Sequence, residues 1–362
     1  MFFSVVIPAY NRKPILEKCL RSLEHQQFDA GAIAGYEVVV VDDGSTDGTV
    51  DWLQANAETF PHIRLFQQDH QGPAAARNLG VEKASGDTII FIDSDLVVTE
   101  GFLQAHAEGL QRGQEAEGRG QKAESRRQEA ESPQNSKLSS LSAQSATQNS
   151  PSSSPTPHSP LPPPPPVFTY GRVINTANFD DPTAEPYKIT DFSAAYFATG
   201  NVAIARVWLE KAGLFDTRFQ LYGWEDLELG VRLKQIGLTL IKCPDAVGYH
   251  WHPPFALNQL PNLIEKEIER GKMGVLFYQK HPTWNVRIMI QMTWIHRVLW
   301  GVLSLGGRLN ERTMAPFLQW LIDRGKPQLA LEVARIFLNW YNVQGVYEAY
   351  ADLQRTSKTA HS

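Results

Sequence analysis

The stretch IIFIDSDLVV, residues 89–98, joins a strand pattern to two charged side chains. Its first four residues are apolar and β-rich, which predicts a strand buried in a sheet. Asp93 and Asp95 follow with only Ser94 between them. Two carboxylates this close repel each other, and a sheet core offers them no partner. We therefore expect the strand to leave the core here, with both aspartates facing something that they bind.

Strand and helix patterns alternate through the N-terminal part of the chain. The Val run at residues 38–41 is typical of a strand buried on both faces. The order of elements predicts an open, mostly parallel sheet flanked by helices on both sides. We expect strands at 2–10, 36–45, 63–68 and 88–95, and helices at 14–26, 49–58 and 74–84.

The composition changes sharply at residue 113. Residues 113–166 are rich in Gln, Glu, Ser and Pro and almost free of aromatic and branched side chains. Such a segment cannot bury enough apolar surface to offset the entropy lost on ordering, so we expect a disordered insertion. A linker between two domains is the alternative. Insertion is favoured because strand character resumes at VFTYGRVINT, residues 167–176.

The proline tract is interpreted as a spacer, with binding to an SH3-type groove as the other reading.

The whole-chain composition limits the class of protein. The chain has 362 residues, 42% of them hydrophobic, and a net charge of −5, which gives no general reason to bind nucleic acid. Its two cysteines, Cys19 and Cys243, suggest neither a disulfide framework nor a Cys-based zinc site. No secretory signal or apolar run of about 18 residues is visible. We expect a cytoplasmic protein.

Polar residues gather where the predicted strands end. The first strand ends at Pro8, Tyr10, Asn11 and Arg12, and the second ends at Asp43 and the residues after it. Ligands of open α/β sheets bind at this edge. A Tyr ring can stack on a base, and a carboxylate can accept from an imide or a ribose hydroxyl. The second loop, DDGSTDGT, also suits a plain helix-capping turn.

The pattern of glycines excludes two common phosphate sites. No G-x-G-x-x-G follows the first strand and no G-x-x-x-x-G-K-[ST] is present. Paired acids such as Asp93 and Asp95 instead suit Mg²⁺ or Mn²⁺, which can bridge to a diphosphate. Arg77 opens a predicted helix and could add positive charge nearby.

Four motifs in this order resemble the nucleotide-binding half of family 2 glycosyltransferases with the GT-A fold: VVIPAYNR, VVVVDDGSTDGT, GPAAARNLG and IIFIDSD. The resemblance covers about residues 3–100 and 168–255. It implies that Asp95 is a direct metal ligand and that Asp93 lies nearer the ribose. The donor-binding residues that it implies are Pro8, Tyr10, Asn11, Arg12, Asp43, Arg77, Asp93, Ser94, Gly200 and Asn201.

The motif GWEDLELGVRL, residues 223–233, is similar to the acidic acceptor-site motif of that family. We expect Asp226 to be the general base, with Glu225 orienting the acceptor or the reverse. Helix-terminal acids that complement the helix dipole are the structural alternative. Trp224 and Tyr222 could stack on a sugar, although such aromatics often serve packing.

The segment YHWHPP could complete a metal site. His250 and His252 lie two residues apart, so on a strand both face the same side. Either could be the third ligand, and His250 is preferred because of where the related strand of the family delivers its histidine.

Taken together, these patterns predict a metal-assisted, inverting glycosyltransferase of polysaccharide or glycoconjugate biosynthesis. It would use a nucleotide sugar, UDP-linked by preference, with a glycan, lipid-linked or protein-linked acceptor and no nucleic acid. A sugar nucleotidyltransferase, or a non-catalytic nucleotide-sugar-binding protein with a proline-rich arm, is the alternative. The expected parts are the nucleotide-binding half at 1–112, the insertion at 113–166, the acceptor-binding half at 167–260 and a helical region at 261–362.

The helical region beyond residue 260 matches no motif. Trp294, Arg297, Leu299 and Trp300 could form an interfacial helix, which would place the protein peripherally at the inner face of the membrane. A core helix of an appended bundle is the preferred reading.

Overall fold

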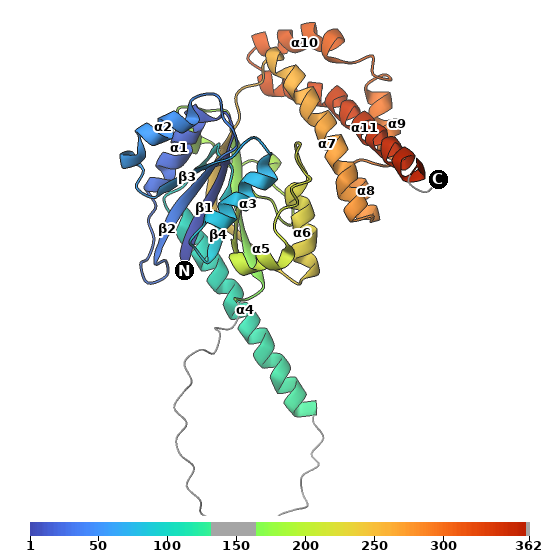
Figure 1. The fold of residues 1–362 in the computed structure, drawn as a ribbon. Helices are drawn as coiled ribbons and strands as arrows, with labels where there is room; N and C mark the ends of the chain where they lie inside the picture. The colour runs from blue at the N-terminus through green and yellow to red at the C-terminus, as the bar shows by residue number, and fades with distance from the viewer. Residues whose placement is uncertain (132–163, 360–362) are drawn as a thin grey trace, which may run out of the picture.

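The computed structural model describes residues 1–131 and 164–359 as a mixed α/β protein with an appended helical region (Figure 1). Its centre is an eight-stranded sheet in the order β3-β2-β1-β4-β7-β6-β8-β5. The strands are β1 (Phe2–Ala9), β2 (Gly35–Asp42), β3 (Ile63–Gln67), β4 (Thr88–Ile92), β5 (Leu96–Val98), β6 (Val167–Thr176), β7 (Asn201–Ala205) and β8 (Thr239–Trp251). The helices of this part are α1 (Lys13–Glu24), α2 (Thr49–Ala55), α3 (Pro73–Lys83), α4 (Phe102–Glu131), α5 (Arg206–Ala212) and α6 (Glu225–Gln235).

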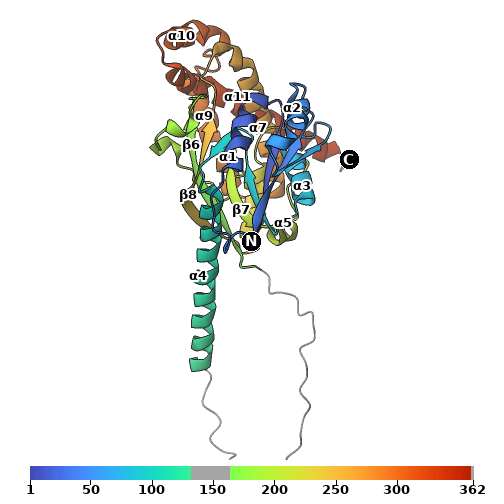
Figure 2. The same cartoon turned by 90° about the vertical axis from the view of Figure 1, so that its left-hand side faces the viewer.

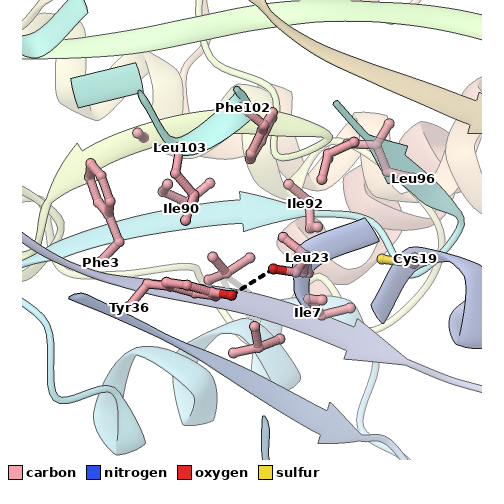
Figure 3. Packing of buried hydrophobic residues seen from close by; sticks show 14 of the residues in the cluster. Phe3, Ile7, Cys19, Leu23, Tyr36, Ile90, Ile92, Leu96, Phe102 and Leu103 are labelled. Carbon is pink, nitrogen blue, oxygen red and sulfur yellow. Dashed lines mark hydrogen bonds between the residues drawn. The ribbon is translucent and has the colours of Figure 1, made fainter. Parts of the chain in front are cut away.

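The N-terminal strands pair in parallel, as the β-α-β-α order predicts. β1 lies between β2 and β4, and β2 also pairs with β3. Alternate side chains of β1 enter different cores, because successive residues of a strand point to opposite faces. Val5 and Ile7 pack with α1 and α4, as Figure 3 shows for Ile7, whereas Val6 packs with α3. In the first core, the Tyr36 hydroxyl donates to the Leu23 carbonyl oxygen at 2.7 Å.

The sheet continues across the inserted segment. β4 pairs antiparallel with β7, and β5 pairs antiparallel with β8, although residues 132–163 separate these strands in the sequence. Because both sides of this segment build one sheet, it interrupts a single sheet and does not link two separate ones. The prediction of disorder for residues 132–163 falls outside the described residues.

A helix passes through residue 113, where the insertion is predicted to start. α4 runs from Phe102 through residue 113 to Glu131 and projects away from the sheet (Figures 1 and 2). Residues 114–131 consist mainly of Ala, Glu, Gln, Lys and Arg. These residues have high intrinsic helix propensity, which favours continuation of the helix.

A fully buried polar network joins the two halves of the sheet. His106 of α4 contacts the Thr169 hydroxyl through Nδ1 at 2.7 Å and Asn201 Oδ1 through Nε2 at 2.9 Å. The Asn201 amide donates to the carbonyl oxygens of Arg172 and Ala246 at 3.1 and 2.9 Å. Burial lowers the pKa of His106 to about 4, so the ring is neutral near pH 7. Asn201 is 0% exposed, which contradicts its predicted place beside the diphosphate. Its amide cross-links strands instead.

The C-terminal helices pack on the second half of the sheet domain. They are α7 (Leu260–Lys280), α8 (Trp284–Met289), α9 (Trp294–Leu303), α10 (Glu311–Asp323) and α11 (Pro327–Thr359). α7 and α11 lie side by side (Figure 1). A Cβ at Gly271 of α7 would lie 2.6 Å from the Asn342 carbonyl oxygen of α11, so glycine permits this close approach.

An ionic cluster attaches the C-terminal helices to α6. Glu228 of α6 is fully buried, and its carboxylate lies 2.7 Å from Lys280 Nζ, 2.9 Å from His281 Nε2 and 2.7 Å from an Arg232 nitrogen. A buried carboxylate that lost these partners would be strongly destabilising. The helical region is therefore joined to the acceptor half and is not independent of it. Within residues 1–131 and 164–359, no helix is both long and apolar enough to cross a bilayer.

Asn201→Ala should lower the free energy of unfolding by on the order of 2–4 kcal/mol, because two buried carbonyl oxygens and His106 would lose their partner. Urea denaturation measures this loss. The matched control is Asn285→Ala at an exposed position of α8, which should change stability by less than about 0.5 kcal/mol. If the variant had unchanged stability and bound nucleotide more weakly, Asn201 would be a donor-binding residue and not a structural one.

Candidate active site

The loops after β1 and β2 hold each other at the carboxyl edge of the sheet. Asn11 has a positive φ of 53° and donates its backbone N–H to the Ser45 hydroxyl at 2.9 Å. Its side-chain oxygen accepts from the backbone N–H of Thr46 at 2.7 Å. Asn tolerates this left-handed backbone better than most residues. The predicted donor residue Asn11 thus fixes the shape of the site edge, while Pro8 still lies in β1 beside Val41.

Asp43 organises a third loop, at residues 68–72. Its carboxylate accepts the backbone N–H groups of Gln71 and Gly72, both at 2.9 Å, and the Gln68 amide at 2.7 Å. His70 Nδ1 lies 2.9 Å from the same carboxylate. Both carboxylate oxygens therefore already have protein partners, so Asp43 builds a wall of the site.

The ring of Tyr10 lies exposed at this edge. It is 45% exposed and stacks on the His70 ring, with 4.3 Å between centroids and 24° between planes. Because Tyr10 follows β1 and His70 lies in the loop ordered by Asp43, the strand-end loops together present a flat aromatic surface. A planar base could use such a surface. His70 was not among the predicted site residues.

Asp93, Asp95 and His250 form a cluster with the donor set of a divalent metal site. One ligand atom from each residue lies within 4.8 Å of the others. Asp93 and Asp95 follow β4, and His250 lies in β8, where the antiparallel pairing of β5 and β8 sets it opposite Leu96. Two carboxylates and an imidazole suit Mn²⁺ or Mg²⁺, so these residues fit the metal that the sequence suggests.

His250 and a nearby arginine lie beside the carboxylate of Asp95. His250 Nε2 lies 2.9 Å from Asp95 Oδ1, and an Arg12 nitrogen lies 3.7 Å from Oδ2. Burial alone would raise the pKa of Asp95, but the hydrogen bond and charge of His250, with the charge of Arg12, lower it. Burial alone would lower the pKa of His250, and Asp95 raises it instead. Each group stabilises the charged form of the other.

His252 has a different partner. Its Nε2 atom lies 3.1 Å from Asn175 Oδ1, and its ring centroid is 4.2 Å from that of His250. Burial and the neighbouring His250 lower the pKa of His252 to about 4. The two rings share a side of the chain, as their spacing predicts, but His250 is the one that contacts Asp95.

Arg77 connects this cluster to α6. Its guanidinium lies 3.1 Å from Asp93 Oδ1 and 2.9 Å from Glu225 Oε1, and the residue is 5% exposed. Burial alone would lower the pKa of Arg77, but the charges of Glu225, Asp93 and Asp226 raise it. Among the described residues, neither Arg77 Nε nor Glu225 Oε2 has a hydrogen-bond partner. Polar atoms that are buried and unpartnered mark a place where a ligand could bind.

Asp226 is adjacent to this pair at the start of α6. Burial and the negative charge of Glu225 raise the pKa of Asp226 to about 7, although Arg77 opposes the shift. Its carboxylate accepts one backbone N–H, that of Leu227, at 2.7 Å. A carboxylate that titrates near neutral pH can take a proton from an acceptor hydroxyl. Glu225, in contrast, is engaged with Arg77.

Trp224 does not have its predicted place at the acceptor. It is 6% exposed and packs in the core formed with α7, where its indole N–H donates to the Arg270 carbonyl oxygen at 2.7 Å. Its φ of 77° is strained for a non-glycine residue, so these contacts hold the backbone turn that begins α6. The neighbouring Tyr222 is 50% exposed and is the aromatic side chain left available to a sugar.

The remaining predicted residues, Gly200 and Ser94, lie close to Asp93. A Cβ at Gly200 would lie 3.3 Å from Asp93 Oδ2, so the absence of a side chain keeps this oxygen accessible. Ser94 lies between β4 and β5 and is 7% exposed.

α7 contributes a cation that no sequence motif indicated. Lys266 Nζ lies 5.5 Å from the centroid of the Tyr222 ring. Burial and the positive charge of Arg12 lower the pKa of Lys266, while Asp95 opposes the shift. Lys266 is therefore close enough to interact electrostatically with the cluster. It lies in an ordinary amphipathic pattern, and only the docking of α7 brings it to the site.

Comparisons with known proteins find glycosyltransferases. Residues 4–150 match the model described as glycosyl transferase family 2. The uncharacterized glycosyltransferase YfnE of Bacillus subtilis (strain 168) is 29% identical over 274 residues, which are 69% of this chain and 65% of YfnE. The chondroitin synthase of Escherichia coli is 28% identical over 276 residues, 73% of this chain and 37% of the synthase. The chain thus spans less than two thirds of these relatives.

A solved structure shares the fold. It is a mannosyltransferase of Pyrobaculum calidifontis in complex with GDP-Man and Mn²⁺, with a TM-score of 0.51 and 18% identity over 97% of this chain and 87% of the other. The GT-A fold expected from the sequence motifs is confirmed at this level.

Asp226→Asn should raise the melting temperature, and the gain should grow from pH 5 to pH 8. Between the ordinary pKa of 3.8 and the folded value of about 7, the unfolded chain releases a proton that folded Asp226 retains, so wild-type stability falls as pH rises. Asparagine does not titrate, so the variant does not lose stability at this position as the pH rises. The control is Asp323→Asn at an exposed position, which should leave the pH profile of the melting temperature as it is. A gain equal at both pH values would contradict the raised pKa.

Proposed function

We propose that this chain is a member of glycosyl transferase family 2 and that it transfers a sugar from a nucleotide-diphosphate donor to an acceptor hydroxyl with inversion. One observation carries the proposal. Buried Arg77 binds Asp93 of the metal-type cluster and Glu225 of the acid pair, so the two groups of acids belong to one continuous site. A donor diphosphate and an acceptor hydroxyl could therefore bind next to each other in this site.

The nucleotide would bind along the carboxyl edge of the sheet. Tyr10 offers an exposed ring for the base, UDP being the preferred nucleotide. Arg12 and Lys266 supply positive charge for the diphosphate, since neither is committed to a short ion pair with the cluster. Asp95 and His250, with Asp93, would hold Mn²⁺ or Mg²⁺. When bound, such an ion neutralises charge on a departing diphosphate.

The acceptor would bind at the start of α6. Asp226 is the proposed general base, because its raised pKa makes it a proton acceptor near neutral pH and its partner Glu225 is held by Arg77. Glu225 Oε2, which is buried and unpartnered, is placed to accept a hydrogen bond from the acceptor. One base and a single displacement lead to inversion at the anomeric carbon.

The acceptor is proposed to be a glycan, free or linked to lipid or protein, in polysaccharide or glycoconjugate biosynthesis. Two relatives are named as chondroitin synthases, and both are longer than this chain. A sugar nucleotidyltransferase is disfavoured because the loop after β1, with Tyr10, Asn11 and Arg12, lacks glycines for a triphosphate. A non-catalytic binder would not need a carboxylate with the raised pKa of Asp226.

A panel of nucleotides tests the proposal at the binding step. With Mn²⁺ or Mg²⁺ present, at least one nucleoside diphosphate or its sugar should raise the melting temperature by several degrees, since ligand at a hundred times Kd adds about 2.7 kcal/mol. Asp95→Asn should abolish the metal-dependent part, and the exposed control Asp323→Asn should retain it. If no diphosphate nucleotide stabilises the protein under any metal condition, the proposed donor class is wrong.

Asp226→Asn should reduce turnover by at least about a hundredfold while leaving metal-dependent nucleotide binding intact, because it removes a proton acceptor and keeps the shape. In the wild type, kcat/KM should rise with pH through about pH 7, where Asp226 loses its proton. The titration belongs to the pair of Asp226 and Glu225 as a unit.

Glu225→Gln serves as the comparison for this base. It should weaken acceptor binding and raise KM, with the rise of kcat/KM through neutral pH still present. If instead the Glu225 variant lost this pH dependence and the Asp226 variant kept it, the roles of the two acids would be exchanged.

A further inference from the structure

The outer face of α9 carries an unusually apolar surface. We define the α9 face as Trp294, Ile295, Val298, Leu299 and Val302. These side chains are 71%, 55%, 54%, 46% and 66% exposed. They fall at positions i, i+1, i+4, i+5 and i+8, which lie on one side of a helix. Scattered exposed apolar residues are ordinary, but a contiguous face of this kind marks an interaction surface.

The opposite side of α9 is fixed against the bundle. A Cβ at Gly301 would lie 3.4 Å from the Trp340 ring of α11, and the Trp300 indole N–H donates to the Gln291 side-chain oxygen at 2.6 Å. The Arg297 guanidinium lies 4.9 Å from the Tyr347 ring centroid. These contacts hold the helix in one orientation, at the edge of the bundle in Figure 1. The α9 face is therefore presented outward by the fold.

The segment that carries the α9 face contains arginines and no acidic residue. Residues 284–310 contain Arg287, Arg297 and Arg308 and no Asp or Glu. Arg297 and Arg308 are exposed. Apolar side chains bordered by arginines match an anionic lipid surface, where the rings and alkyl groups enter the interface and the guanidinium groups meet the headgroups. Two copies joined through this face would instead bring arginines toward arginines.

The length of α9 sets how it would meet a bilayer. Ten residues extend about 15 Å along a helix, half of the roughly 30 Å hydrocarbon core, so α9 can lie in the interface but cannot span it. We propose that the α9 face docks the protein on the surface of an anionic lipid bilayer. This docking is independent of the proposed sugar transfer, and its test does not use enzymatic activity.

Co-sedimentation of the full chain with vesicles tests the proposal. Wild-type protein should bind vesicles of phosphatidylcholine with phosphatidylglycerol at least tenfold more tightly than vesicles of phosphatidylcholine alone. Trp294→Ser with Val302→Ser should weaken binding to the anionic vesicles at least tenfold. Both positions are exposed, so the fold should be retained, as circular dichroism and the melting temperature would show.

Two matched comparisons identify which part of the surface acts. Ile189→Ser with Val207→Ser removes exposed apolar side chains outside the bundle, 92% and 41% exposed, and should leave vesicle binding unchanged. Arg308→Gln keeps the apolar face and the contacts that orient α9, and it should reduce the preference for anionic vesicles. Added salt should also reduce the preference of the wild-type protein for anionic vesicles, because it screens the attraction between arginines and headgroups.

Three results would overturn the proposal. Wild-type protein could fail to bind either kind of vesicle. The Trp294 and Val302 double variant could bind as tightly as the wild type. Light scattering could also show a dimer that this variant converts to a monomer without any vesicle binding, which would make the α9 face a contact between two copies of the chain.

Discussion

The site depends on one buried guanidinium. Arg77 is placed by α3 beneath the end of β4, where it meets Asp93, and it reaches Glu225 at the start of α6. Removing an arginine from water is costly unless its charge is paired, so the two carboxylates and the arginine need one another. Because Asp93 and Glu225 belong to opposite sides of the inserted segment, this requirement aligns the two halves of the domain. The acid pair of α6 cannot move far without exposing an unpaired buried charge.

The start of α6 is strained, and the C-terminal helices stabilise it. Trp224 adopts a positive φ that costs of order 1–3 kcal/mol in a non-glycine residue. The contacts of its ring with α7 and the ionic cluster around Glu228 offset this cost. The same docking carries Lys266 to the edge of the metal-type cluster. The helical region thus takes part in forming the site, even though no motif within it indicates chemistry.

Local patterns predicted the parts of this protein that depend on local physics. Alternating elements, the buried Val run of β2 and the polar strand ends all appeared at the expected places. His250 lies beside Asp95, and its role as the third metal ligand stays a prediction. The misplacements concern residues whose partners lie far away in the sequence. Asn201 follows a motif-like glycine, but its amide donates hydrogen bonds to carbonyl oxygens of β6 and β8. Trp224 precedes the acid pair, but α7 buries it. α4 was not predicted, and it continues past residue 113 because its residues have high helix propensity.

The excess negative charge in the site favours ligands that bring a cation or give up a proton. Asp93, Asp95, Glu225 and Asp226 lie near one another, and Arg77 can fully offset only part of their charge. His250 Nε2 lies 2.9 Å from Asp95, and the nearest Arg12 nitrogen is 3.7 Å away, longer than a hydrogen bond. Asp226 responds by holding its own proton to near neutral pH. In the proposed function, the carboxylates of Asp93 and Asp95 would hold a divalent ion on one side of Arg77. On the other side, Asp226 would take a proton from the acceptor. An arrangement built for stability alone would have replaced at least one of these acids with a neutral side chain.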